Sequence, residues 1–288
     1  MAAAAAAAGL LLCAAAVVPQ GIAAAYYGKL IGPIKTNAHG FTGNVYAAND
    51  YNVIITDLNY DGKGPEAFFW AGTGKEPDDK GQQVLDENGS SAVLKAYKNA
   101  RVLLTLPKKI TDYQYLGVYC RKFGANFGHV SIPSGFELPR EQSLGPLATK
   151  AHEAQATQVF LKDSATMELK QFKYDGQGPA AFFVVAPSVN ARQADMVKLL
   201  DENGKDSKLG WYGGKDVVLK LPDGRHWNEF RWFSVYCFQA SLSFADIAID
   251  AAEELPVHNL SSVAAASTAV SHAATLWVLA CLVAALVS

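Results

Sequence analysis

Along most of the chain, apolar and polar residues alternate with a period close to two, which predicts β-strands rather than helices. Two such runs surround the turn residues Asn49 and Asp50, so residues 42–57 are expected to form a hairpin. In the first half, further strands are expected over residues 68–70, 101–106, 116–120 and 127–132. The second half has the same pattern over residues 158–161, 167–172, 182–185, 217–221, 230–237 and 243–249. For residues 191–200, a turn or two of helix is left open.

A turn motif that precedes an aromatic strand occurs twice. The first copy is Asp61-Gly62-Lys63-Gly64-Pro65, and the second is Asp175-Gly176-Gln177-Gly178-Pro179. Glycine supplies positive φ angles, aspartate caps the turn, and proline presets φ while preventing a helix. The motif is therefore interpreted as a turn between two strands rather than as a ligand-binding loop.

The two turns belong to a longer internal duplication. Its landmarks recur in one order, with an offset that grows from 113 residues between Gly32 and Gly145 to 117 between Cys120 and Cys237. Each copy has roughly a hundred residues, a common domain size that can bury its own core. We therefore predict an all-β protein with two tandem antiparallel domains, each a β-sandwich or barrel. The expected domains are residues 26–133 and 144–251, and the expected linker is 134–143.

The net charge and the composition of the two chain ends indicate where in the cell the protein is expected. The net charge is −2, from 25 basic and 27 acidic side chains, and there is no basic run, so nucleic acid is not an expected partner. No charged residue precedes Lys29 or follows Glu254. Residues 9–18 are apolar and are followed by Pro19 and small residues, which is typical of a secretory signal peptide over residues 1–25.

Residues 252–288 are expected to form a stalk and a membrane-attachment signal. Small residues around Ser262 and Ala264 precede an apolar tail, an arrangement typical of GPI attachment. The alternative is a single membrane-spanning helix from Val263 to Val287. Both interpretations place the protein in the secretory pathway and at the extracellular face of the plasma membrane. There, the sequons at Asn88 and Asn259 would be glycosylation sites.

Four cysteines are encoded, but Cys13 lies in the expected signal peptide and Cys281 in the apolar tail. Cys120 and Cys237 remain, at matching positions of the two copies. No motif for zinc binding, haem attachment, hydrolysis or phosphate binding occurs, so no metal site is expected, and whether the protein is an enzyme stays open. Alternation with aliphatic neighbours places both thiols on the inward face of their strands.

Three interpretations of these thiols remain open. They could be small hydrophobic core groups, partners in a disulfide, or reactive groups in a redox site. Arg121 and Lys122 would help to lower the pKa of a thiol at Cys120, whereas the second copy lacks this basic pair. A disulfide needs Cα atoms within about 7 Å. Two thiols in separate domain cores are therefore expected not to be bonded to each other.

Histidines are the natural partners for such a thiol. His39 and His152 occupy matching positions, while His129 corresponds to Asp246 in the second copy. A lone histidine in a loop is more often solvated than a ligand, so these side chains are expected to be solvated.

The duplicated sequence motifs resemble those of the DM-thirteen, or Skeletor-type, family of extracellular domains. The resemblance covers all of the first copy and, more weakly, all of the second. Its motifs in the first copy are His39-Gly40-Phe41-Thr42-Gly43-Asn44-Val45, Asn59 to Pro65, Phe68-Phe69-Trp70, Leu106-Pro107, Val118-Tyr119-Cys120 and Asn126-Phe127-Gly128. The second copy departs from them at Thr157, which replaces Gly43, and in the run from Leu242 to Asp246.

The resemblance implies cell-surface redox or electron transfer through one cysteine in each domain. Cys120 and Cys237 both match that position. The resemblance implies that the cysteine there acts as a free thiol or as a ligand to haem iron. A mechanism that required His129 could operate only in the first copy. The expected function is thus a membrane-tethered redox module with an extracellular redox partner. The alternative is a non-enzymatic adhesion or matrix-binding protein with structural thiols.

Overall fold

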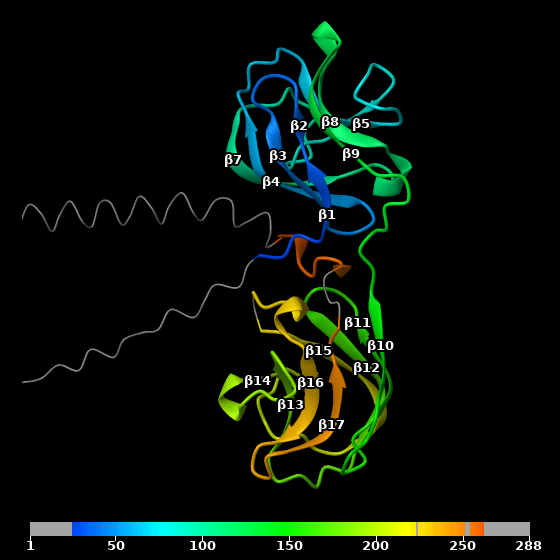
Figure 1. Cartoon of the computed structure of the whole chain (residues 1–288), viewed down its shortest axis with the longest axis vertical. Helices are drawn as coiled ribbons and strands as arrows, with labels where there is room; N and C mark the ends of the chain where they lie inside the picture. The colour runs from blue at the N-terminus through cyan, green and yellow to red at the C-terminus, as the bar shows by residue number, and fades with distance from the viewer. Residues whose placement is uncertain (1–24, 223, 251–253, 262–288) are drawn as a thin grey trace, which may run out of the picture.

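The computed structural model describes residues 25–222, 224–250 and 254–261, which fold into two β-sandwiches (Figure 1). All sheet pairings in these residues are antiparallel, so the predicted all-β class with two tandem domains is confirmed. None of the helices in this part of the chain has the length and apolarity to cross a membrane. The attachment candidates Ser262 and Ala264, the tail, and nearly all of the expected signal peptide lie outside the described residues.

The first sandwich packs a four-stranded sheet of order β1-β3-β4-β7 against a five-stranded sheet of order β2-β9-β8-β5-β6. The strands of the first sheet are β1 (Lys29–Pro33), β3 (Thr42–Ala47), β4 (Asn52–Tyr60) and β7 (Tyr97–Thr105). Those of the second sheet are β2 (Lys35–Thr36), β5 (Ala67–Gly72), β6 (Gln82–Val84), β8 (Tyr115–Cys120) and β9 (Ala125–Ser131).

The second sandwich repeats this topology with sheets of order β10-β11-β12-β15 and β14-β13-β16-β17. The first sheet contains β10 (Gln142–Leu147), β11 (Ala156–Leu161), β12 (Thr166–Tyr174) and β15 (Tyr212–Lys220). The second sheet contains β13 (Ala181–Ala186), β14 (Val197–Lys198), β16 (Trp232–Cys237) and β17 (Leu242–Ala248). Each strand of the first sandwich except β2 therefore has a counterpart in the second.

Short 3-10 turns are the only helical elements with named bounds in the described chain. They are η1 (Ile110–Asp112), η2 (Arg121–Phe123), η3 (Gln193–Asp195) and η4 (Trp227–Glu229). The stretch 191–200, where helix was left open, contains η3 and then strand β14.

The expected hairpin at Asn49 is confirmed, and its turn has a clear physical cause. The Asn49 side-chain oxygen accepts hydrogen bonds from the backbone N–H groups of Tyr51 and Asn52, both at 2.9 Å. This Asx turn reverses the chain between β3 and β4, which then pair in antiparallel register. The hairpin places alternate apolar residues of both strands, such as Val45 and Ile55, in the core between the sheets.

Each sandwich has its own core. The first contains Cys120 with residues from β3, β4, β5, β7, β8 and β9, and the second contains Cys237 with residues from the matching strands. Leu138, in the expected linker, is buried against the first core. Since both cores are closed and separate, burial of apolar area can stabilise each sandwich through its own contacts.

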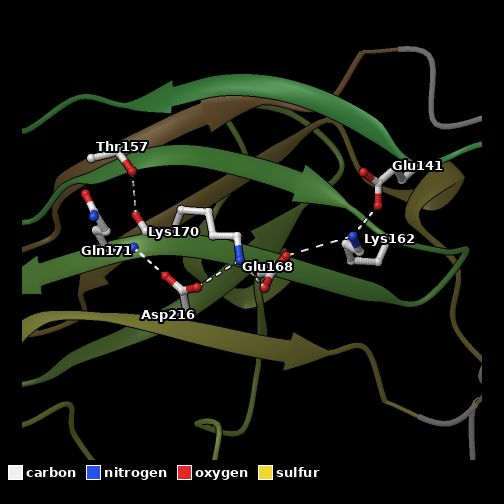
Figure 2. A network of polar contacts seen from close by, with 7 residues as sticks. All are labelled: Glu141, Thr157, Lys162, Glu168, Lys170, Gln171 and Asp216. Carbon is white, nitrogen blue, oxygen red and sulfur yellow. Dashed lines mark hydrogen bonds and ion pairs between the residues drawn. The ribbon is translucent and has the colours of Figure 1, made fainter.

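The outer faces of the two matching sheets differ. Ile54 lies between Tyr46 and Leu103 on neighbouring strands of the first sheet and is fully buried. The corresponding residue in β12 is Glu168, between Phe160 and Val218. There, charged side chains of β12 and β15 form a ladder that continues to Lys162, just after β11 (Figure 2), and Lys170 bridges Glu168 and Asp216 at 2.7 and 2.8 Å. The second domain therefore presents this sheet face to solvent, whereas the first domain covers it.

Residues 254–261, which we call the C-terminal strap, cover the apolar face of the first domain (Figure 1, orange). Val257 packs on Ala48 and Ile54, and its N–H donates to the Ala48 carbonyl at 2.9 Å. The strap also contacts the second domain, because Leu255 is buried in that core and the Ser164 N–H donates to the Pro256 carbonyl at 2.8 Å. The strap thus links the two sandwiches in addition to the direct chain connection.

Candidate functional site

Cys120 and Cys237 end equivalent strands, β8 and β16, and both are fully buried. In the sheet register Cys120 lies between Ala67 and Ala125, and Cys237 between Ala181 and Leu242. Alternation directs Leu116, Val118 and Cys120 into the core between the two sheets, as predicted from the sequence. In the first domain both cross-strand neighbours of the cysteine are therefore alanines, whereas in the second one of them is a leucine.

The thiols are both free and lie in different cores, so the disulfide interpretation is wrong. The physical reason is the one expected: each cysteine points into the interior of its own sandwich, where the other cannot reach it. The reactive thiol and the buried hydrophobic group remain as interpretations.

A tyrosine lies near each thiol and is hydrogen-bonded to a glycine of the turn motif. The Tyr60 hydroxyl oxygen accepts a hydrogen bond from the Gly64 N–H at 2.9 Å, and Tyr174 accepts one from Gly178 at 2.8 Å. Burial raises the pKa of Tyr60 above its ordinary value, with smaller contributions from the negative charge of Asp61 and from Cys120. Burial also raises the pKa of Tyr174, with smaller contributions from Asp175 and Cys237. Each tyrosine hydroxyl therefore stays protonated beside its thiol.

A phenylalanine closes the other side of each site. A Cβ atom added to Gly64 would lie 2.5 Å from Phe127 and 2.8 Å from the Ala67 side chain, beside Cys120 in the sheet. The corresponding atom on Gly178 would lie 2.6 Å from Phe244. Only glycine fits at these two positions, which gives the turn motif a packing role that its sequence did not reveal.

The outermost part of each site is a histidine–aspartate pair. His39 Nδ1 lies 3.0 Å from both Asp61 carboxylate oxygens, and His152 Nδ1 lies 2.9 and 3.2 Å from those of Asp175. A carboxylate can only accept, so Nδ1 carries the proton in each pair. The His39 ring lies 4.1 Å from the Phe127 ring, and the His152 ring 4.2 Å from Phe244.

The expectation that His39 and His152 are simply solvated is therefore wrong. The aspartates come from the duplicated turn motif, where Asp61 Oδ1 also accepts from the Lys63 N–H at 2.8 Å. This hydrogen bond, reinforced by His39, holds the pKa of Asp61 below its usual range. The sequence signal was available, since both copies keep a histidine 22 or 23 residues before the aspartate.

His129 has a different role, because it lies on the opposite face of its sheet from Cys120. It faces Gly117 on β8, where a Cβ atom would lie 2.7 Å from the His129 Cβ. Its ring is buried, Nδ1 lies 3.1 Å from Asn126 Nδ2, and burial lowers the pKa of His129. Asp246 in the second copy instead pairs with Lys150. Neither residue contacts its domain's tyrosine–thiol site.

The side of β8 that faces away from the core is also buried. Trp70, Tyr115 and Tyr119 form a cluster there, beneath the loop that follows β5. The Trp70 indole N–H donates to the Asp78 carbonyl at 2.8 Å and fixes this loop. Arg121, which was considered as a neighbour that lowers the thiol pKa, lies over the Phe68 ring at 4.4 Å. It therefore belongs to this outer face, away from the sulfur.

The surroundings of the thiols do not fit a haem. Tyr60, Ala67 and Phe127 converge so closely at Gly64 that a single added carbon atom would clash with them. A macrocycle bound through Cys120 would require this core to be displaced. In the described residues, no group of three or more histidine, cysteine, aspartate and glutamate side chains could hold a metal ion.

Both expected glycosylation residues, Asn88 and Asn259, are exposed. Asn88 lies in a turn capped by Asp86, whose side chain accepts its backbone N–H at 2.9 Å. Asn259 lies near the end of the C-terminal strap.

Comparison with known proteins agrees with the internal duplication of the chain. The family model described as "Electron transfer DM13" matches residues 33–132 and 146–249. Protein Skeletor of Drosophila melanogaster is 34% identical over 238 residues, which cover 81% of this chain, in both its isoforms B/C and its isoforms D/E. This chain covers 30% of the first relative and 16% of the second, less than a third of either. No solved structure matches. The chain belongs to the DM13 family and contains two copies of its domain.

Proposed function

We propose that the chain is a redox module that transfers electrons through Cys120 in the first domain and Cys237 in the second. The observation that carries this proposal is the repetition of one arrangement: a free buried thiol with the same tyrosine, phenylalanine and histidine–aspartate neighbours. Other parts of the two copies have diverged, such as the outer sheet faces at Ile54 and Glu168. The family's description as an electron transfer domain supports the same function.

Burial of the sulfur atoms limits the chemistry. A partner protein's thiolate would have to contact the sulfur to exchange disulfides, and both sulfurs are shielded. Electron transfer does not require contact. In the proposed step, the thiol S–H bond breaks, one electron passes to a one-electron carrier at the surface, and the proton is released to solvent. Return of one electron and one proton to the sulfur radical restores the thiol.

A second candidate function is adhesion or matrix binding without redox chemistry. Complete burial of both thiols favours it, because a free cysteine in a closed core often serves only as a small hydrophobic group. In that case the two sandwiches would act as a rigid scaffold, and the partner would bind their outer surfaces.

We place either function at the extracellular face of the plasma membrane. The support is in the sequence: a signal-peptide pattern over residues 1–25 and small residues around Ser262 and Ala264 before an apolar tail. Exposure of Asn88 and Asn259 is compatible with glycosylation in the secretory pathway. A GPI anchor is preferred to a membrane-spanning helix.

The test is reduction of ferricyanide, a one-electron oxidant, by the purified full-length protein. The variants are Cys120→Ala, Cys237→Ala and the double substitution, with circular dichroism to verify folding. Each single variant should deliver about half the electrons of the wild type, because distant independent sites contribute additively. Equal oxidant consumption by the wild type and the double variant would exclude the thiols and leave adhesion as the better function.

A further inference from the structure

A layered set of rings lies on one side of each thiol site. Phe127 and Phe244 are almost fully buried, whereas the side chains of His39 and His152 are 30% and 33% exposed. The histidine ring covers the phenylalanine ring, which in turn lies 6.2 Å from the Tyr60 ring in the first domain and 6.1 Å from Tyr174 in the second. The histidine is thus the outermost group on this side of both thiol sites.

The backbone and the aspartate together hold each histidine in position. His39 and His152 both have φ of 56°, a left-handed conformation that L-residues rarely adopt. Each histidine's carbonyl accepts the N–H of its aspartate at 3.1 Å, and its ring pairs with the same aspartate's carboxylate. A strained conformation persists only where surrounding contacts determine it. Here the same strain and contacts occur in both domains.

We propose that His39–Asp61 and His152–Asp175 are latches, each of which controls access to the thiol of its own domain. The proposal rests on the redox function for its biological use, but thiol accessibility can be measured independently of that function. When a latch is closed, the histidine holds the phenylalanine over the tyrosine and the thiol. When it opens, a small uncharged molecule can reach the sulfur while the rest of the sandwich stays folded.

Local opening is physically reasonable at this point of the fold. Both members of each pair are about one-third exposed, so solvent weakens their electrostatic attraction. The histidine lies in the turn before β3 or β11, outside the strands that hold the core together. Segments of this kind open at a lower free energy than the whole domain.

The experiment is alkylation of the intact two-domain protein by iodoacetamide without denaturant, with Cys120 and Cys237 peptides quantified separately by mass spectrometry. His39→Ala should accelerate labelling of Cys120 by about tenfold, equivalent to ~1.4 kcal/mol, and leave Cys237 unchanged. His152→Ala should have the reverse effect. The other thiol in each variant is therefore an internal control.

His258→Ala is the matched control. His258 is a third partly exposed histidine, with Nδ1 3.0 Å from the Asp163 carboxylate, but it belongs to the C-terminal strap. Its removal should change neither labelling rate. The urea dependence of labelling separates latch opening from unfolding, because local opening exposes little surface and gives a shallow slope.

The latch proposal is overturned if His39→Ala leaves Cys120 labelling unchanged, accelerates both thiols equally, or acts only with the steep urea dependence of global unfolding. A domain-specific acceleration with a shallow slope supports it, whatever the ferricyanide assay shows. Conversely, loss of ferricyanide reduction in the cysteine variants supports the redox function even when the latch variants label normally. The two proposals can therefore fail separately.

Discussion

The hydroxyl oxygen of Tyr60 accepts a hydrogen bond from the backbone N–H of Gly64, at 2.9 Å and deep in the first core. Tyr174 and Gly178 repeat this bond in the second domain at 2.8 Å. In both domains it fixes the turn motif to the strand before it and brings the glycine against a core phenylalanine, Phe127 or Phe244. The turn motif therefore contributes to the site through its packing as well as through its shape.

Gly64→Ala should destabilise the first domain by about 1–3 kcal/mol, because the added methyl group overpacks a closed core. It would lie 2.5 Å from Phe127 and 2.6 Å from the Tyr60 hydroxyl. Chemical denaturation followed by hydrogen exchange in each domain is the measurement. Gly210→Ala is the control, since a Cβ atom there meets nothing within 4 Å. Equal stability losses in the two variants would show that the Gly64 site is less tightly packed than described.

Acidification should weaken the first domain through His129. Burial lowers the pKa of His129, so the folded domain resists protonation while the unfolded chain takes up a proton near pH 6.5. The stabilising effect of the neutral ring is therefore complete above about pH 6.5 and is lost as the pH falls further. Hydrogen exchange of β8 peptides at pH 7.5 and 5.5 measures this loss. His129→Gln should reduce it, and an unchanged pH dependence in the variant would contradict the assignment.

Val257→Asp should detach the C-terminal strap from the first domain. It places a charge against Ala48 and Ile54 in an apolar contact, with an expected cost of the order of 2–3 kcal/mol. The measurements are small-angle X-ray scattering, which should report a less compact pair of domains, and limited proteolysis of the strap. Val189→Asp is the control, since Val189 is 60% exposed. A Val257→Asp protein with wild-type scattering and protease resistance would show that the strap does not hold the domains together.

Residue alternation alone was enough to predict much of this fold. It located the β3–β4 hairpin, the main central strands and the inward direction of Cys120 and Cys237, because a strand with one core-facing side carries that information locally. The internal duplication then predicted two similar domains.

Features that depend on distant partners were not predictable in the same way. His39 and Asp61 were assigned separately, as a loop residue and a turn residue, and only the fold brings them together. The C-terminal strap was missed because nothing in residues 254–261 specifies which sheet face they cover. Ile54 was expected to belong to a strand, but it is buried in a cluster with the distant strap and the N-terminal tyrosines rather than in the core between the sheets.

The central claim is that each domain holds its own unpaired thiol in a closed core, and a domain-resolved thiol count tests it most directly. The full-length protein is alkylated without reductant, first in its native state and then in denaturant, and the peptides that contain Cys120 and Cys237 are identified by mass spectrometry. The structure predicts slow labelling in the native state and complete labelling of both cysteines after unfolding, because both side chains are free and fully buried. A peptide in which Cys120 is linked to Cys237, or rapid native labelling of both thiols, would contradict it.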